Sequence, residues 1–201
     1  MSSPYIPINL AINQIKDGIP VIILDNPERE NEGDFFVAAT EIEPKHISFM
    51  FKYARGNICV PLTYERASYL QLTLQHPNVE QDKSFCRTLC EVDFINVHGG
   101  VSYRNRVDTI RALADPLYSY KSFNPGHTRP LRADRGGLLT RLGHTEGAVE
   151  LSRLAGLQPA GVICELVGDN GYMLKGKDLE GFALKHNIGI ITINDIVNAI
   201  K

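Results

Sequence analysis

Segments with the pattern of strands and segments with the pattern of helices alternate along the whole of this chain. The apolar run "IPVIILD" at 19–25 is typical of a buried strand, and "NP" directly after it favours a turn. Before it, Ile8, Ile12 and Ile15 have helical spacing, and Gly18 suits the end of that helix. Because strands and helices that mix in this way bury their apolar faces against each other, the pattern favours an α/β fold with layers around a mixed sheet.

The remaining segments predict further elements of the same fold. Strands are expected at 35–40, 57–62, 160–167 and 188–193, and helices at 43–54, 64–70, 106–115, 145–156, 178–187 and 194–200. "GDNG" at 168–171 is a turn signal that predicts a hairpin after the strand at 160–167. The stretch 122–137 is rich in Pro and Gly and is expected to be a loop. No repeat or linker divides the sequence, so we expect a single domain over 1–201.

Composition and charge exclude several classes of partner. The formal net charge is −2, so the chain has no basic footprint for nucleic acid and no overall cationic attraction to a membrane surface. No apolar run is long enough to span a bilayer, and "MSSPYIPINL" at the start lacks the features of a signal peptide. The four cysteines form no CxxC pair, so we expect no structural zinc site, and reduced thiols in a cytoplasmic protein.

A cluster of acids, "RENEGD" at 29–34, follows the first strand. Side chains alternate in an extended segment, so Glu30, Glu32 and Asp34 would lie on one side of it. Three converging carboxylates repel one another unless a cation or hydrogen bonds stabilise them. The segment therefore predicts either a cation site or a solvated acidic turn, and taken alone these residues favour the turn.

A second cluster lies in "LTRLGHTEGAVEL" at 139–151. Thr145 is expected to open a helix, with Arg141 and His144 just before it. The free N–H groups and the dipole at a helix start form an anion site, where an arginine would hold phosphate through paired hydrogen bonds. His144 has three interpretations, which are a metal ligand, a phosphate donor and an ordinary capping residue.

Two further titratable residues lie in contexts that suit proton transfer. His127, in the irregular stretch "NPGHTRP", is either an exposed loop residue or a placed acid–base group. Glu165 stands within an apolar strand, "GVICELV". It either points outward while Cys164 and Leu166 point inward, or it is a semi-buried carboxylate with a raised pKa.

Taken together and in this order, the motifs resemble those of 3,4-dihydroxy-2-butanone 4-phosphate synthase, an enzyme family of riboflavin biosynthesis. The matching stretches are "RENEGD", "NICVPLT", "DTIRALAD", "PGHTRPLRA", "GGLLTRLGHTE" and "RLAGLQPAGVICEL". "RENEGD" and "GHTE", with "PAGVICEL" downstream, are specific in combination. The resemblance implies the family's layered α-β-α fold and a homodimer. It also implies a lyase that converts D-ribulose 5-phosphate to 3,4-dihydroxy-2-butanone 4-phosphate and formate through an enediol.

The resemblance assigns roles to residues as well. Glu30 and His144 would be ligands of Mg²⁺, or of Mn²⁺, because carboxylate and sugar oxygens favour hard ions. His127 and Glu165 would be the essential proton-transfer residues. The residues expected to contact the sugar phosphate are Arg29, Glu30, Asp34, Arg141, His144, Thr145 and Glu165, with Arg141 and Thr145 on the phosphate.

The segment 85–106 departs from the family's pattern. It reads "FCRTLCEVDFINVHGGVSYRNR" where the family usually has stretches like "FTVSID", "GVTTG" and "SAxDR". His98 and Gly99 replace two threonines near the substrate, and Asn105 replaces an aspartate. These changes leave two alternatives open, a paralogue that acts on another phosphorylated ketose and a non-catalytic module that binds phosphosugars.

Overall fold

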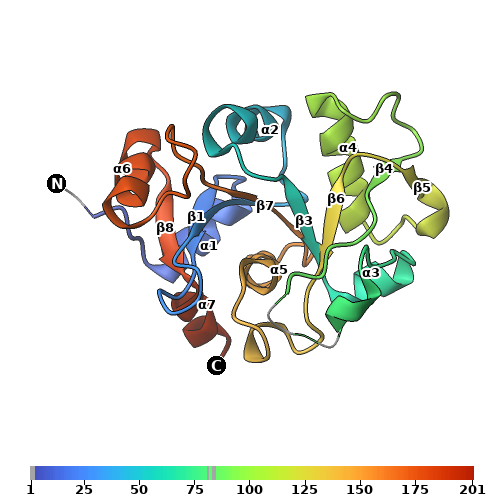
Figure 1. Ribbon diagram of the computed structural model, residues 1–201. Helices are drawn as coiled ribbons and strands as arrows, with labels where there is room; N and C mark the ends of the chain where they lie inside the picture. The colour runs from blue at the N-terminus through green and yellow to red at the C-terminus, as the bar shows by residue number, and fades with distance from the viewer. Residues whose placement is uncertain (1–2, 81, 83–84) are drawn as a thin grey trace.

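The computed structural model describes residues 3–80, 82 and 85–201. In this part of the chain a six-stranded mixed sheet has the order β6-β3-β7-β2-β1-β8 (Figure 1). Its strands are β1 (Val21–Leu24), β2 (Gly33–Ala38), β3 (Cys59–Leu62), β6 (Arg129–Arg132), β7 (Gly161–Glu165) and β8 (Gly189–Thr192). The pairs β1–β8 and β3–β6 are parallel, and the other pairs are antiparallel. A separate ribbon pairs β4 (Val92–Phe94) with β5 (Phe123–Pro125).

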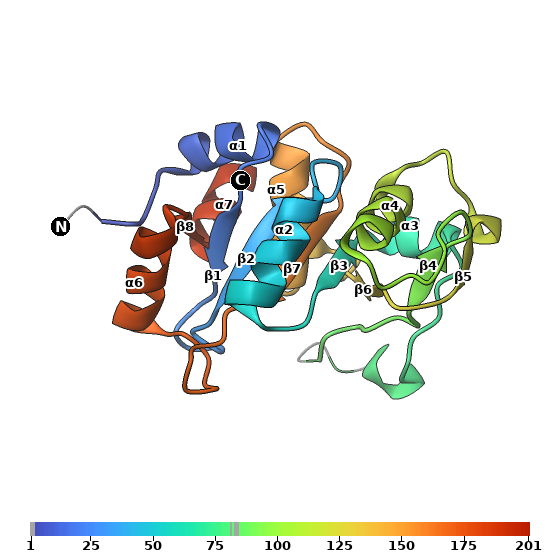
Figure 2. The same cartoon turned by 90° about the horizontal axis from the view of Figure 1, so that it is seen from above.

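Helices cover both faces of the sheet (Figure 2). They are α1 (Ile8–Lys16), α2 (Pro44–Phe49), α3 (Tyr64–Tyr69), α4 (Tyr103–Ala114), α5 (His144–Leu154), α6 (Gly176–His186) and α7 (Ile193–Ile200). Apolar side chains of α1, α5 and α7 form one core cluster with the sheet, and those of α2, α3, α4 and α6 form a second. The predicted layered α-β-α arrangement around a mixed sheet is therefore confirmed. No helix of the described residues is both long enough and apolar enough to cross a membrane.

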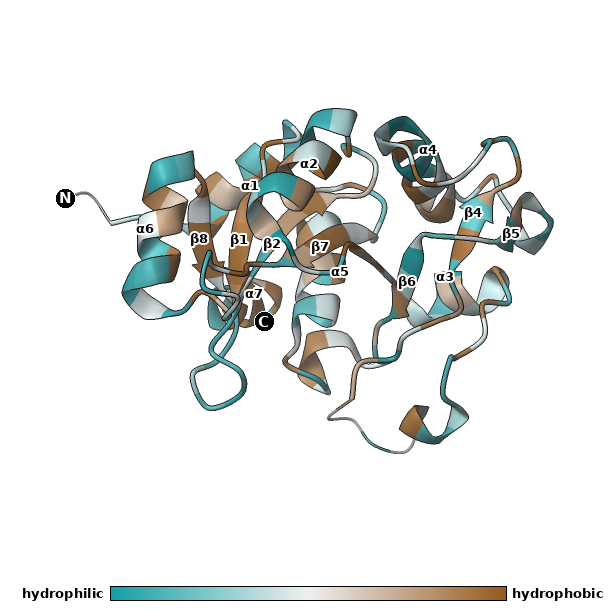
Figure 3. Cartoon of the chain, turned by 45° about the horizontal axis from the view of Figure 1, so that its top comes forward, coloured by the Kyte–Doolittle hydropathy of each residue, from teal (hydrophilic) through white to brown (hydrophobic). Residues whose placement is uncertain are grey.

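The alternation of side chains along β1 and β2 divides the core between the two faces of the sheet. Ile22 and Phe35 belong to one core cluster, whereas Ile23 and Phe36 belong to the other. All four are fully buried, because helices lie on both faces. Figure 3 shows β1 and β7 coloured largely as hydrophobic. This burial on two sides explains why the strands read as continuous apolar runs.

Most of the predicted elements are present, with small shifts at their ends. The helix expected at 43–54 is α-helical to Phe49, and a π-helical turn, Met50–Ala54, completes it. After β7, Val167 bridges Met173 across the turn, as the hairpin signal predicted.

The prediction of a loop at 122–137 is wrong, because this stretch contains β5 and β6. β6 includes Pro130, which lacks the N–H group needed for a ladder hydrogen bond. β6 is the last strand of the sheet, however, and proline is tolerated on edge strands. The carbonyl of Pro130 accepts a hydrogen bond from the N–H of Leu89 (3.0 Å). Partners distant in the sequence therefore made a strand where the local composition indicated a loop.

The C-terminal end of α4 depends on a side chain from α3. The guanidinium of Arg66 donates hydrogen bonds to the backbone oxygens of Ala112, Leu113, Asp115 and Tyr118, at 2.6 to 3.2 Å. Carbonyls at a helix end have no partner within the helix, so these bonds replace water. We expect Arg66→Met to lower the free energy of unfolding by about 2–4 kcal/mol, measured by urea denaturation with an unchanged m value.

Arg104→Met is the matched control, because Arg104 is exposed in the first turn of α4. It is expected to change the free energy of unfolding by less than about 0.5 kcal/mol. An equally small change for Arg66→Met would mean that the four hydrogen bonds add no net stability.

Candidate active site

A cavity of about 340 Å³ opens where the loop after β1, the start of α5 and the end of β7 meet. The predicted site residues that line it are Arg29, Glu30, Asp34, Arg141, His144, Thr145 and Glu165. They come from three separate parts of the sequence. The fold therefore gathers into one cavity all the predicted site residues except His127, which is described below.

The acidic loop, residues 25–32, connects β1 to β2 as a turn and not as an extended segment. Residues 27–30 form the turn. The prediction assumed an extended segment, in which alternation would put Glu30, Glu32 and Asp34 on one side. That assumption is wrong. The three side chains nevertheless line the same cavity. Of these three acids only Glu30 is exposed, as the alternative of a solvated turn requires, since Glu32 is half-buried and Asp34 is buried.

Asp25, which was not among the residues predicted for the site, anchors the acidic loop. It is buried directly after β1. One of its carboxylate oxygens accepts the N–H of Glu32 (2.8 Å), and the other pairs with the guanidinium of Arg29 (2.7 Å). The available signal was an acid at the end of the apolar run "VIILD", because a buried carboxylate needs partners that fix it in place.

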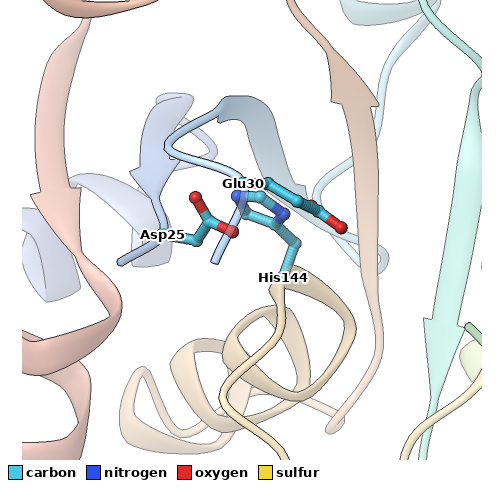
Figure 4. Close-up of side chains that lie close together, drawn as sticks. All are labelled: Asp25, Glu30 and His144. Atoms are coloured by element: carbon cyan, nitrogen blue, oxygen red, sulfur yellow. The ribbon is translucent and has the colours of Figure 1, made fainter. Parts of the chain in front are cut away.

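Asp25, Glu30 and His144 have the composition of a site for a divalent cation. Figure 4 shows their side chains converging from the acidic loop and from the start of α5. Their candidate ligand atoms all lie within 4.8 Å of one another. Two carboxylates and one imidazole suit Mg²⁺ or Mn²⁺, which prefer oxygen ligands. The fold thus brings together the two predicted ligands, Glu30 and His144, and adds a second carboxylate, that of Asp25.

The orientation of His144 fits a ligand better than a cap. It is the first residue of α5, and Gly143 precedes the helix without a side-chain capping bond. The Nε2 atom of His144 lies 3.1 Å from the carbonyl oxygen of Glu32, which can only accept a hydrogen. A neutral imidazole that donates this hydrogen bond through Nε2 has its lone pair on Nδ1, which lies 3.8 Å from Asp34 Oδ2.

The start of α5 has the properties of an anion site. Arg141 and Thr145 are buried beside the first helical turn, whose N–H groups lack partners within the helix. Glu146 holds the guanidinium of Arg141 (Nη1–Oε2 2.6 Å), and both side chains are almost fully buried. The other oxygen of Glu146 accepts the N–H of Asp134 (2.9 Å). These bonds fix the guanidinium of Arg141 beside the cavity, close to the start of α5.

Asp34 and Glu165 are cross-strand neighbours on β2 and β7. Burial raises the pKa of Asp34 to about 7, the imidazole of His144 opposes this rise, and the carboxylate of Glu165 adds to it. Oε2 of Glu165 accepts the N–H of Asn57 (2.6 Å). A side chain at Gly56 would collide with Glu165, so glycine lets the backbone approach the carboxylate. Glu165 is half-buried in the cavity wall, while its two strand neighbours are buried in the core.

His127 lies apart from the other predicted site residues. It lines an adjoining cavity of about 240 Å³, which shares Asn57 and Arg129 with the main one. Its Nδ1 atom lies 2.6 Å from Oδ2 of Asp93, and its backbone N–H donates to the other oxygen of that carboxylate (3.0 Å). A side chain at Gly100 would collide with Asp93 and His127, so glycine leaves room for this pair. His127 is therefore held in a fixed orientation, although its side chain is 52% exposed.

The divergent segment 85–106 contributes Cys86 and Thr88 to the cavity wall. His98 and Asn105 do not line the cavity among the described residues, and the side chain of Asn105 instead donates to the carbonyl of His98. Cys59, from β3, is a further lining residue. No signal in the sequence marked Cys59 or Cys86, because a single cysteine resembles an ordinary small apolar residue.

Comparison with known proteins gives a family model, curated relatives and solved structures that match this chain. The family model described as "3,4-dihydroxy-2-butanone 4-phosphate synthase" matches residues 9–199. A curated protein of that name from Candida albicans is 43% identical over 204 residues, which span 100% of both chains. The crystal structure of the Candida albicans synthase has a TM-score of 0.87 and 43% identity, over 98% of each chain. A crystal structure of the synthase "in complex with two Magnesium ions" has a TM-score of 0.89 and 34% identity, over 98% of this chain and 97% of that one.

Several curated relatives are longer than this chain. "Riboflavin biosynthesis protein RibBA" from Endomicrobium trichonymphae is 45% identical over 192 residues, which are 94% of this chain and 47% of that protein. The chain thus spans about half the length of this and similar relatives.

Proposed function

Because the chain belongs to the 3,4-dihydroxy-2-butanone 4-phosphate synthase family, we propose that it converts D-ribulose 5-phosphate to 3,4-dihydroxy-2-butanone 4-phosphate and formate in riboflavin biosynthesis. The observation that carries this proposal is one cavity that holds three kinds of group. These are a candidate cation site, a candidate anion site beside Arg141 and a half-buried carboxylate. A sugar phosphate that loses a proton needs all three.

Phosphate binding falls to the start of α5. The N–H groups of the first helical turn attract an anion, and Arg141 adds charged donors beside them. Thr145 supplies a hydroxyl at the same place. Arg29 and Asp34 line the rest of the cavity and would contact the sugar. A phosphate fixed at one end keeps a small, flexible sugar oriented while bonds change at the other end.

Glu30 and His144 would hold the divalent ion, with Asp25 as a further carboxylate within reach. We infer Mg²⁺, or Mn²⁺ in its place, from the predominance of oxygen donors. Such an ion, when bound, stabilises the negative charge that develops on the sugar oxygens. The carbonyl of Glu32 would orient the imidazole of His144 by accepting its Nε2–H.

Proton transfer falls to Glu165 and His127. Glu165 would remove the proton next to the substrate carbonyl, which gives an enediol, and the N–H of Asn57 would keep its carboxylate in place. Asp93 accepts from Nδ1 of His127, so Nε2 is the atom free to exchange a proton. His127 lies in the adjoining cavity, and the shared wall of Asn57 and Arg129 links the two groups.

We also propose that the protein is a homodimer. Apolar side chains are exposed near the cavity that His127 lines. They include Phe51 (47% exposed) and Val101 (53% exposed). The ring of Phe51 stacks on that of Tyr103 (42% exposed), with 5.7 Å between the ring centroids. A second copy would remove this apolar surface from water. Sedimentation equilibrium is expected to give twice the mass of the chain, and a monomer at micromolar concentration would contradict the proposal.

The direct test of the activity is formate release from ribulose 5-phosphate. Purified protein with Mg²⁺ is expected to release formate. Treatment with EDTA should stop this release, and Mg²⁺ added in excess of the EDTA should restore it. The expected dependence on metal follows from the candidate ligand atoms of Glu30, His144 and Asp25, which lie within 4.8 Å of one another. If folded, Mg²⁺-loaded protein releases no formate above background, the proposed activity is wrong.

The alternative substrate, another phosphorylated ketose, retains one observation in its favour. Cys86, from the divergent segment 85–106, lines the cavity and lies 3.8 Å from the hydroxyl of Thr145. A panel of pentose and hexose ketose phosphates separates the two cases by kcat/KM. Ribulose 5-phosphate is expected to give the highest value, and a higher value for any other ketose would favour the paralogue.

A further inference from the structure

The acidic loop collects more negative charge than its own arginine can offset. Residues 25–32 include four carboxylates and one arginine. The base of the loop is closed by hydrogen bonds between Asp25 and Glu32 (2.8 and 3.1 Å). The tip, which includes Glu30, bonds mostly to other residues of the loop. Like charges repel at this spacing, so the tip needs a cation if it is to stay folded over the cavity.

Lys175 provides such a cation from a distant part of the chain. It lies between the hairpin turn that follows β7 and the start of α6. Its Nζ donates to the backbone carbonyl of Glu30 (2.7 Å) and pairs with Oε1 of Glu32 (3.2 Å). The acidic loop and the hairpin turn lie side by side at one end of the sheet (Figure 2). One ammonium group thus joins the tip of the loop to its base.

The segment that carries Lys175 is itself fixed to the sheet. Its neighbour Leu174 donates its N–H to the carbonyl of Leu166 (2.8 Å), directly after β7. The side chain of Lys175 makes no capping hydrogen bond to α6, so its removal takes no side-chain cap from that helix. The bond to the carbonyl of Glu30 restrains the backbone, while the carboxylate of Glu30 pairs with Arg29 (2.7 Å) and not with Lys175.

We propose that Lys175 is a positioning residue, which holds the acidic loop in the conformation that presents Glu30 to the divalent cation. The inference rests on the proposed cation site for its functional consequence, but not for its effect on the loop. Removal of Lys175 has two opposite effects on cation affinity. It loosens the loop, which weakens binding, and it removes a positive charge, which strengthens binding. The side chain of Lys175 is 46% exposed, so water and salt screen its repulsion of the cation, and loosening of the loop is the larger effect.

Hydrogen–deuterium exchange of the metal-free protein tests the restraint on the loop. Lys175→Met is expected to raise the exchange rate of amides at 26–32 about tenfold, which corresponds to loss of one charge-assisted hydrogen bond. Lys175→Arg, which keeps charge and donors, is expected to restore slow exchange. Lys177→Met removes a neighbouring lysine on α6 and is expected to leave 26–32 unchanged. Equal exchange in Lys175→Met and the parent protein would overturn the proposal, as would failure of arginine to restore it.

Titration with Mn²⁺, followed by its electron paramagnetic resonance signal, tests the consequence for the cation. Lys175→Met is expected to raise the Mn²⁺ concentration at half saturation about five- to tenfold, while the melting temperature falls by no more than about 5 °C. The value for Lys177→Met reports the effect of charge alone. Tighter Mn²⁺ binding in Lys175→Met would show that the charge, and not the restraint, dominates, and would overturn the proposal. Neither measurement needs turnover, so both remain valid if the chain releases no formate.

Discussion

Glu165→Gln is expected to lower kcat for formate release about 10³-fold, while the variant keeps the fold and the affinity for inorganic phosphate. Glutamine has the shape of glutamate, and its carbonyl oxygen can still accept the N–H of Asn57. What it loses is the ability to take a proton from the substrate. The measurement is a steady-state formate assay at saturating ribulose 5-phosphate, with phosphate inhibition measured in parallel.

Glu150→Gln is the matched control for this change. Glu150 lies on α5 and pairs with Arg153 (2.6 Å), away from the cavity that holds Glu165. Its kcat is expected to stay within about twofold of the parent. A Glu165→Gln variant that retains more than a tenth of the parent rate would exclude Glu165 as the main base. A variant that loses activity together with phosphate binding would point to a damaged cavity.

Arg141→Met is expected to lower kcat/KM for ribulose 5-phosphate about 10²- to 10³-fold, through the loss of charge-assisted bonds to the phosphate. The change should appear mainly as a higher KM, because the phosphate group does not react. Inorganic phosphate should lose its inhibition by a similar factor. That second readout does not depend on turnover, so it tests the anion site by itself.

Arg141→Met also breaks a buried ion pair, and a second variant separates that effect from the loss of phosphate binding. Arg141→Met leaves the carboxylate of Glu146 buried without its ion-pair partner, which is expected to reduce stability by about 3–5 kcal/mol. The double variant Arg141→Met, Glu146→Gln is neutral at both positions and is expected to recover much of that stability. Its phosphate affinity should remain low. If the double variant binds phosphate like the parent, Arg141 is not the phosphate ligand.

Arg153→Met is the control for loss of an arginine from the same region. Arg153 is exposed near the end of α5 and pairs with Glu150. It is expected to change kcat/KM less than twofold, because exposed ion pairs contribute little and long-range charge is screened by salt.

All the predicted site residues except His127 line one cavity. The metal and proton-transfer roles came from the resemblance to a known family, whereas the residue types alone left alternatives open. Acids after a strand predicted a cation site as one of two alternatives, and the start of a helix with Arg141 predicted an anion site. Asp25 was missed because a single acid at a strand end is also a common turn residue. Lys175 was missed because a lysine beside a helix start has no distinctive pattern, and its contact with Glu30 is visible only in three dimensions.

The fold errors had a similar cause. Pro130 and its neighbours read as a loop because composition describes only the local preference of the backbone. Pairing with β3 made the segment an edge strand. In the acidic loop, alternation was the wrong rule because residues 27–30 turn instead of extending.

The amino-acid sequence alone indicates the layered class of fold and the types of side chain available to a site, because the period of apolar residues sets which side chains are buried and which remain free to react. Which of those side chains come into contact depends on the three-dimensional fold. Strand pairing and loop closure between residues far apart in the chain bring Glu30 close to His144 and bring Lys175 into contact with the acidic loop. Those contacts depend on the packing of the whole sheet, and no local pattern records them.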